Sequence, residues 1–263
     1  MGELLKVQGL KFSWGDNLVI DSADFVVEEN ELVSILGKNG AGKSTLMKCL
    51  NKILKPDQGK IMIHGEDITQ LDLLATSKKM SYVPQSITSN FSMDVFDVVL
   101  LGRRPYITWS VSETERDIVS KTINKMGLSD LAFRRFDRLS GGEKQRVVIA
   151  KAVAQEPNLF LFDEPTSDLD LKNQIEVMKG LRKIVSEEEG KAAVIAIHDI
   201  NIASRFSDRI MLLHEGKIIS NGKPSEVLTP ENIELVFEVT SESIVDDDGI
   251  LRIIINDEIT KEK

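Results

Sequence analysis

A glycine-rich segment from Gly37 to Thr45 constrains this chain more than any other feature. It fits the pattern G-x-x-x-x-G-K-[ST]. Residues 31–36 before it predict a buried strand, and residues 46–50 after it predict the start of a helix. In that context glycines let successive backbone N–H groups point at phosphate oxygens, and the helix N-terminus adds partial positive charge. The segment therefore predicts a phosphate-binding loop. Its candidate binding residues are Gly37, Asn39, Gly40, Ala41, Gly42, Lys43, Ser44 and Thr45.

The loop predicts a nucleotide site that uses ATP and Mg²⁺. Lys43 is expected to reach the β- and γ-phosphates, and the Ser44 hydroxyl to ligate Mg²⁺. A second apolar run, residues 159–162, ends in Asp163 and Glu164. A carboxylate at the end of a buried strand can hold Mg²⁺, so Asp163 is a candidate metal ligand. Glu164 is then placed to polarise a water molecule for attack on the γ-phosphate. The alternative is a strand that ends in a solvated acidic turn.

Composition sets limits on partners and location. The chain has 263 residues and a formal net charge of −9, so non-specific binding of nucleic acid by the whole surface is not expected. Its single cysteine excludes a disulfide framework within the chain. The N-terminus lacks the long apolar core of a signal peptide, and no run approaches 18 apolar residues. We therefore expect a soluble protein of the cytoplasm.

The order of strand and helix patterns predicts an α/β fold with a mainly parallel sheet around the phosphate loop. Short N-terminal strands are expected at 4–7, 17–20 and 24–27. A helical stretch interrupts the alternation, so we expect a single domain with an inserted helical subdomain. A C-terminal hairpin is expected around Asp248-Gly249. The expected bounds are 1–88 and 156–240 for the core, about 89–155 for the subdomain and about 241–257 for the hairpin.

Helix signals lie inside and after the helical stretch. Ser112 with Glu115, and Ser140 with Glu143, both fit the capping box S-x-x-E. Between Ser140 and Glu143 stand two glycines, which are poor helix formers, so a close approach of another group to that backbone is the functional alternative to a plain helix cap. A long helix is expected to bury one apolar face. That face consists of Leu171, Ile175, Met178, Leu181 and Val185.

Taken together, residues 3 to about 240 resemble the nucleotide-binding subunit of ATP-binding cassette (ABC) transporters. The resemblance rests on the phosphate loop, the signature Leu139-Ser140-Gly141-Gly142-Glu143, the strand ending at Asp163-Glu164 and the motif residues between and after them. It implies that Gln85 contacts Mg²⁺ and the attacking water, and that His198 touches the γ-phosphate. It implies that Trp14 stacks on adenine, although Phe12 is an alternative and a core Phe/Trp pair is the plain structural interpretation. Asp168 departs from the small residue usual at its position.

The resemblance also implies an assembly. Two subunits would pack head to tail with two ATP molecules between them, so that Ser140, Gly141, Gly142 and Glu143 face the nucleotide of the other subunit. Such a homodimer would sit on the cytoplasmic face of a membrane against integral permease subunits, fed indirectly by an extracytoplasmic substrate-binding protein. Apolar residues after Gln85 are expected to form the permease-facing groove, with burial in the core of the subdomain as the alternative. They are Phe91, Met93, Val95, Phe96, Leu100, Leu101, Tyr106 and Trp109.

The segment Val98–Tyr106 points to a cargo class. It contains Leu-Gly-Arg followed by a proline–aromatic pair, which resembles importers of iron-siderophores, haem and cobalamin. Importers of another metal or of an oxyanion are the alternative within transport. A soluble ABC ATPase of iron–sulfur cluster assembly is the alternative outside it.

Overall fold

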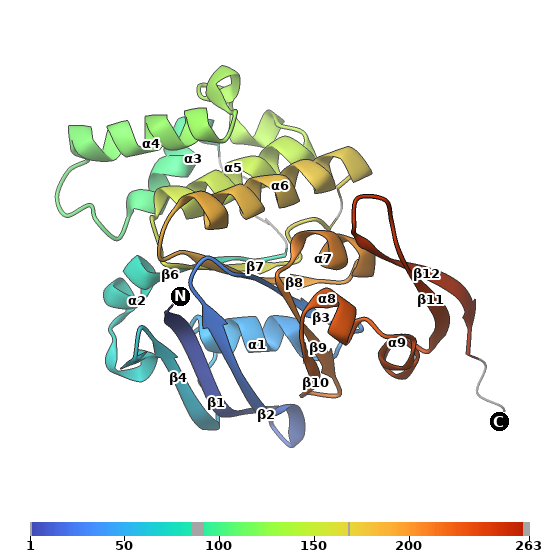
Figure 1. Cartoon of the computed structure of the whole chain (residues 1–263). Coiled ribbons are helices and arrows are strands. Elements are labelled where there is room, and N and C mark those ends of the chain that lie inside the picture. Colours follow the sequence, from blue (N-terminus) through green and yellow to red (C-terminus); the bar gives the residue numbers. More distant parts are fainter. Residues whose placement is uncertain (1, 86–91, 168, 260–263) are drawn as a thin grey trace.

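The fold is built around a six-stranded central sheet (Figure 1). The computed structural model describes residues 2–85, 92–167 and 169–259. The strand order is β10-β9-β3-β8-β7-β6, and all neighbours are parallel except β9 and β10. The mainly parallel sheet is therefore confirmed. Its strands are β3 (Leu32–Leu36), β6 (Met80–Val83), β7 (Leu159–Asp163), β8 (Ala192–Ile197), β9 (Arg209–His214) and β10 (Lys217–Gly222).

The N-terminal strands form a separate antiparallel sheet in the order β2-β1-β4-β5. Its members are β1 (Glu3–Trp14), β2 (Asn17–Glu28), β4 (Gln58–Ile63) and β5 (Glu66–Asp67). The expectation of separate short strands at 17–20 and 24–27 is wrong, because both belong to β2. Ser22 has a φ of 59°, and Gly9 on the paired strand has a φ of 56°. These residues coincide with register shifts between the strands, so β1 and β2 bend there without ending.

Helices cover both faces of the central sheet. Figure 1 shows α3, α4, α5 and α6 on one side, with α1 and the antiparallel sheet on the other. Alternating residues of β3, β7 and β8 divide between two apolar clusters, one on each side. The helices are α1 (Lys43–Leu50), α2 (Leu73–Lys79), α3 (Val95–Leu100), α4 (Glu113–Lys125), α5 (Gly141–Ala154), α6 (Leu171–Glu187), α7 (Ile200–Phe206), α8 (Pro224–Val227) and α9 (Pro230–Phe237).

Two details of the helix predictions need correction. The Ser112 side chain accepts the Glu115 N–H, but the Glu115 carboxylate does not close a capping box, because it pairs with Arg103. The apolar face predicted for α6 is confirmed from Ile175 onward, whereas Leu171 is 79% exposed. Leu171 is the first residue of α6, and its side chain lies outside the core cluster, against which Ile175 is the first residue of this face to pack. Within the described residues, no helix is both long and apolar enough to cross a bilayer.

The C-terminal hairpin forms as expected around the turn at Asp248-Gly249. Its strands are β11 (Val239–Val245) and β12 (Leu251–Glu258). The Asn201 side chain on α7 donates to the Ile253 carbonyl at 3.0 Å and accepts its N–H at 2.8 Å, as a neighbouring strand would. Ser204 of the same helix donates to the Leu251 carbonyl at 2.7 Å. The hairpin is therefore anchored to the helix that follows His198.

Candidate functional site

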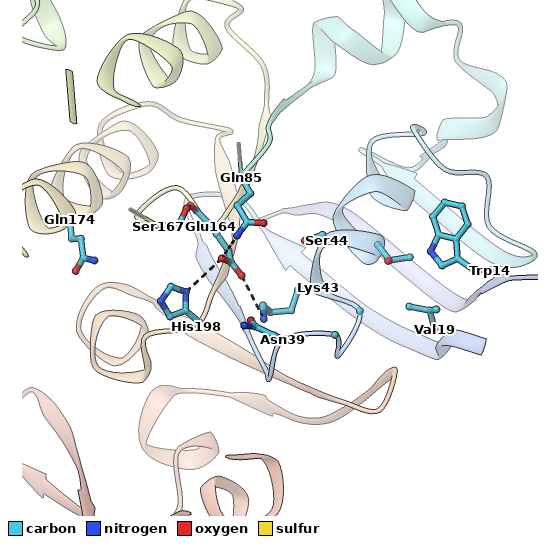
Figure 2. Close-up of a pocket in the computed structure, with 13 residues that line it drawn as sticks. Trp14, Val19, Asn39, Lys43, Ser44, Gln85, Glu164, Ser167, Gln174 and His198 are labelled. Carbon is cyan, nitrogen blue, oxygen red and sulfur yellow. Dashed lines mark hydrogen bonds and ion pairs between the residues drawn. The ribbon is translucent and has the colours of Figure 1, made fainter. Parts of the chain in front are cut away.

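The phosphate loop forms one wall of a pocket of about 720 Å³ (Figure 2). Gly42 has a φ of 106° and lies so close to β2 that an added Cβ would come within 2.8 Å of Ile20. Only glycine fits that position, which explains the last glycine of the motif. The pocket is lined by Trp14, Val19, Asn39, Gly40, Gly42, Lys43, Ser44, Thr45, Gln85, Glu164, Ser167, Gln174 and His198.

Lys43 begins α1 and turns back into the loop. Its Nζ donates to the carbonyl oxygens of Gly37, at 2.8 Å, and Lys38, at 3.2 Å, and lies 3.8 Å from Glu164 Oε1. The side chain is buried, and burial lowers the pKa of the ammonium group, opposed by the charges of Glu164 and Asp163. A cation held this way, with an open pocket beside it, is suited to an anionic phosphate.

Glu164 is the point where the predicted catalytic residues meet. Gln85 Nε2 donates to Glu164 Oε2 at 2.7 Å, and His198 Nδ1 lies 3.7 Å from the same oxygen (Figure 2). Glu164 follows β7 with a φ of 48°, and its N–H donates to the Ala196 carbonyl of the next strand. Three strand ends thus bring Gln85, Glu164 and His198 together, as parallel strands place their carboxyl ends at one edge.

Asp163 lies beneath the pocket and is 2% exposed. Its two carboxylate oxygens accept from the Ser44 hydroxyl at 2.9 Å and from the Tyr82 hydroxyl at 3.1 Å. Burial, with the Asp163 charge, raises the pKa of Tyr82, so the phenol stays neutral and donates. The hydroxyl of Ser44 and the carboxylate of Asp163 are oxygen ligands of the kind that Mg²⁺ accepts beside substrate phosphates. These residues therefore fit the expected ion.

Trp14 rather than Phe12 lines the pocket, at its far end from Glu164 (Figure 2). Trp14 is 56% exposed, whereas Phe12 is 6% exposed and belongs to the core. The two rings are edge to face with centroids 5.1 Å apart, so the core residue fixes the exposed indole from below. Val19 on the paired strand lies beside it in the pocket wall.

The signature residues begin α5 and lie elsewhere. Ser140 and Glu143 close the predicted capping box, since the Ser140 N–H donates to Glu143 and the Glu143 N–H to the Ser140 hydroxyl. An added Cβ on Gly142 would meet the Asn173 side chain, whereas in the described part of the chain one on Gly141 would meet nothing within 4 Å. Of the described residues that line the pocket, none comes from 140–143. A surface at Gly141 is therefore open to another molecule.

A second hollow of about 820 Å³ lies between two segments that are distant in sequence. The predicted permease-facing segment supplies Leu101, Gly102, Arg104, Pro105 and Ile107 to the hollow, whereas Tyr106 is not among the described residues that line it. Val95 is fully buried, so its assignment to an exposed groove is wrong. Met93, Phe96 and Leu100 likewise pack against the core. Trp109 is exposed but does not line the hollow among the described residues. The opposite wall carries exposed apolar side chains beside the polar residues Asn51, Lys52, Thr76 and Ser77. It includes Ile53, Leu73 and Leu74.

Some site residues were missed by the sequence patterns, and two predictions cannot be placed. Tyr82 and Gln174 had no motif of their own, although Tyr82 lies on the strand next to β7. Ser167, which also lines the pocket, belongs to the motif Ser167-Asp168-Leu169-Asp170 that carries part of the resemblance. Phe91 and Asp168 lie outside the described residues.

Comparison with known proteins identifies a family. The family model described as "ABC transporter" matches residues 20–167. An uncharacterized ABC transporter ATP-binding protein of Methanocaldococcus jannaschii is 48% identical over 236 residues, covering 90% of this chain and 92% of that protein. A petrobactin import ATP-binding protein of Bacillus subtilis is 35% identical over 237 residues, covering 90% and 94%.

Solved structures agree with these relatives. A chain of a metal-chelate type ABC transporter in an inward-facing conformation has a TM-score of 0.84 and 28% identity, and the match covers 97% of this chain and 98% of that one. An ATP-binding cassette described as a dimeric post-hydrolysis state, bound to ADP and Pi, has a TM-score of 0.74 and 29% identity, with 84% and 99% covered.

Proposed function

The chain belongs to the ABC transporter family, and we propose that it is the ATP-hydrolysing subunit of an importer for metal chelates such as ferric siderophores, haem or cobalamin. As an ABC ATPase it converts ATP and water to ADP and phosphate. The observation that carries the proposal is the convergence of Lys43, Glu164 and His198 on one pocket floored by Asp163. The relatives are named for transport, which favours import over iron–sulfur cluster assembly.

The chemistry assigned to each residue follows from its place in the pocket. Lys43 and the N–H groups of the loop bind the phosphates, and Trp14 stacks on adenine. Mg²⁺, held by Ser44, Asp163 and Gln85, supplies charge neutralisation at the phosphates when bound. Glu164 accepts the proton of the attacking water, and His198 contacts the γ-phosphate. The Gln85–Glu164 hydrogen bond must open first, since Gln85 occupies one of the oxygens that would orient the water.

A mutation tests this assignment directly. Glu164→Gln keeps the shape of the side chain but removes its basicity, so kcat should fall by about 10²- to 10⁴-fold while ATP still binds. Glu187→Gln, an exposed surface carboxylate at the end of α6, is the matched control and should keep wild-type turnover. Phosphate release at saturating ATP measures both. Wild-type-like turnover in the Glu164 variant would contradict the role.

Two copies are proposed to complete each site. Ser140, Gly141, Gly142 and Glu143 would contact the γ-phosphate held by the partner's phosphate loop, which is consistent with their distance from the pocket of their own chain. The N-terminus of α5 offers backbone N–H groups and partial positive charge for that contact. A related cassette described as dimeric supports the pairing. The interface would be isologous, so each ATP is held by both subunits.

The second hollow is the proposed seat of the permease. Its exposed apolar side chains, Ile53, Leu73, Leu74 and Leu101, suit the apolar face of a short helix from a membrane subunit. We place residues 1–88 and 156–240 in the core, 89–155 in a helical subdomain and 241–257 in the hairpin extension, with the hollow between core and subdomain. The subunit would then lie on the cytoplasmic face of the membrane, and an extracytoplasmic binding protein would deliver cargo to the permease.

The cargo class is inferred from one segment of the chain and from two comparisons. It rests on the segment Val98–Tyr106, on a relative named for petrobactin import and on a neighbour described as metal-chelate type. Deleting the gene and measuring uptake of labelled ferric chelates and cobalamin tests it. A selective loss of one of them is expected. Normal uptake of both, with a defect for another metal or an oxyanion, would replace the cargo and leave the ATPase intact.

A further inference from the structure

The short junction between α5 and β7 is fixed by side chains from outside it. This junction, residues 154–157, is called the connector here. Arg103 Nη1 donates to its first carbonyl oxygen at 2.6 Å, and the Tyr106 hydroxyl donates to its second at 3.2 Å. Lys191 Nζ donates to the third at 3.3 Å and to the fourth at 2.6 Å. Three side chains therefore donate hydrogen bonds to four consecutive carbonyl groups. In an ordinary surface turn, water molecules would donate these hydrogen bonds.

Arg103 anchors the connector from the side of the helices. Its side chain is 3% exposed, and its guanidinium pairs with Glu115 of α4 and, at 2.7 Å, with Glu156 of the connector itself. The guanidinium also lies over the Tyr106 ring, 4.1 Å from its centroid. A planar group with several donors in fixed directions can hold two carboxylates and a carbonyl in a geometry that the ammonium group of a lysine does not reproduce.

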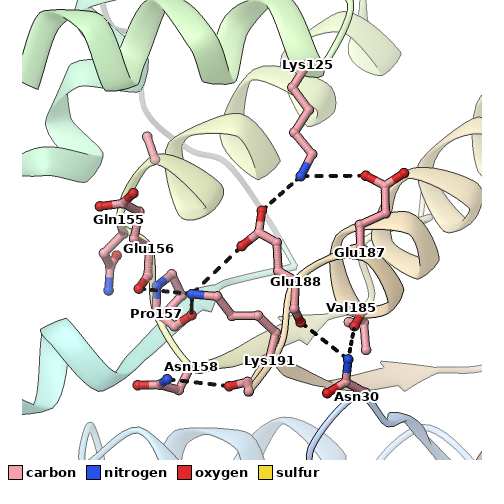
Figure 3. Close-up of polar contacts among 12 residues, drawn as sticks. Asn30, Lys125, Gln155, Glu156, Pro157, Asn158, Val185, Glu187, Glu188 and Lys191 are labelled. Carbon is pink, nitrogen blue, oxygen red and sulfur yellow. Dashed lines mark hydrogen bonds and ion pairs between the residues drawn. The ribbon is translucent and has the colours of Figure 1, made fainter.

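Lys191 also holds the connector, through the carbonyl groups of Glu156 and Pro157 (Figure 3). Its side chain is only 13% exposed, and its Nζ lies 3.9 Å from Glu188 at the end of α6. Glu188 in turn accepts from Lys125 of α4 at 2.8 Å. Arg103 and Lys191 thus reach the same connector, and both are tied to α4.

The connector joins α5 to β7, and the far ends of these two elements carry different parts of the chemistry. Helix α5 begins at Ser140 and Gly141, and strand β7 ends at Asp163 with Glu164 following. In the proposed head-to-tail dimer, the first end acts on the partner's ATP and the second end acts on the chain's own ATP. A rigid connector would make the position of one depend on the position of the other.

We propose that Arg103, Tyr106 and Lys191 are positioning residues that lock α5 to β7 and so couple the two ATP sites of the dimer. This inference rests on the proposed sandwich dimer. Coupling between two sites appears as a Hill coefficient above one, with an upper limit set by the number of sites, here two. Loosening the connector should lower the Hill coefficient and leave the affinity for the first ATP largely unchanged.

The experiment compares ATPase rate against ATP concentration for the full chain and its variants. Wild type should show a Hill coefficient approaching about two. Arg103→Gln, Tyr106→Phe and Lys191→Met should bring it toward one. Arg103→Lys should give only partial rescue, because it lacks the planar fork. The matched control is Arg209→Gln, since Arg209 also joins a carboxylate, Glu31, and a backbone carbonyl, that of Val26, but away from the connector.

Thermal unfolding of each variant separates loss of fold from loss of coupling. If Arg103→Gln does not fold, Tyr106→Phe and Lys191→Met carry the test, because each removes only the donor group. Variants that keep the wild-type coefficient, or lose it no more than Arg209→Gln does, would overturn the inference. So would a wild-type coefficient of one in a chain that still forms an ATP-dependent dimer. A Glu164→Gln chain that forms no dimer with ATP would instead contradict the proposed function.

Discussion

At the scale of single residues, Lys43 is the clearest test of nucleotide binding. Its ammonium group already rests on two loop carbonyls and faces Glu164, so it is positioned before any phosphate arrives. Lys43→Ala should weaken ATP binding by about 10- to 100-fold, the usual worth of a hydrogen bond to a charged group. Calorimetric titration with ATP and Mg²⁺ measures this. Lys48→Ala, on the same helix but away from the pocket, should bind as wild type does.

Cys49 provides a second residue-scale prediction, about the packing of α1. The thiol is fully buried, and burial raises its pKa to about 12, with Asp57 adding to the effect. At pH 8 it is therefore neutral and covered, whereas an exposed thiol has a pKa of about 8.5. A thiol-reactive dye should label the native chain very slowly and the chain in guanidinium chloride at once. Equal rates would mean that α1 is not packed as described.

At the scale of elements, the two glycines that begin α5 separate stability from dimerisation. Gly141 has open space where a Cβ would stand, so Gly141→Ala should keep or raise the melting temperature, since alanine favours a helix by about 1 kcal/mol. The new methyl group would meet the partner's nucleotide, so dimerisation with ATP should weaken. Gly180→Ala, in open space within α6, is the control for helix propensity alone. Equal ATP-dependent dimerisation in both variants would refute a partner at Gly141.

At the same scale, some residues of the site could be predicted from the sequence and others could not. Lys43 could be predicted because it belongs to a recognisable glycine-rich motif, and Asp163 and Glu164 because they stand at the end of an apolar strand. Tyr82 and Gln174 could not, because their roles depend on which elements become neighbours in space. The exposure of Ile53 and Leu73 could not be predicted either, because it too depends on which elements become neighbours in space.

Elsewhere the strength of a local signal misled the prediction. Two short strand patterns, 17–20 and 24–27, suggested separate strands, but pairing with β1 continues through a bend at Ser22 and makes them one strand. Glu115 fits a capping box by spacing, yet the buried Arg103 is a stronger partner than a backbone N–H. Val95 was assigned to an exposed surface by its place in an apolar segment, but α3 turns that side chain into the core. In each case a long-range contact decided the outcome.

At the scale of the whole molecule, net charge opposes the proposed dimer. Each chain carries −9, and two ATP molecules add further negative charge between them. Mg²⁺, the phosphate-loop lysines and the N-termini of α5 must offset that repulsion locally. Repulsion between the outer surfaces of the two chains remains, and salt at 0.1 M screens this repulsion over a Debye length of about 10 Å.

This balance gives a prediction for the assembled state. With ATP and Mg²⁺, Glu164→Gln should run as a dimer in size-exclusion chromatography, because ATP binds and is not consumed; without nucleotide it should run as a monomer. Adding Ser140→Arg should keep the chain monomeric, by placing bulk where the partner's γ-phosphate would lie. The dimer fraction should also rise as salt increases from about 0.01 M to 0.15 M, since screening weakens repulsion between the chains more than the buried contacts at ATP. A dimer indifferent to nucleotide would contradict the sandwich. A dimer that dissociates as salt rises over this range would mean that exposed ion pairs, rather than ATP, join the two chains.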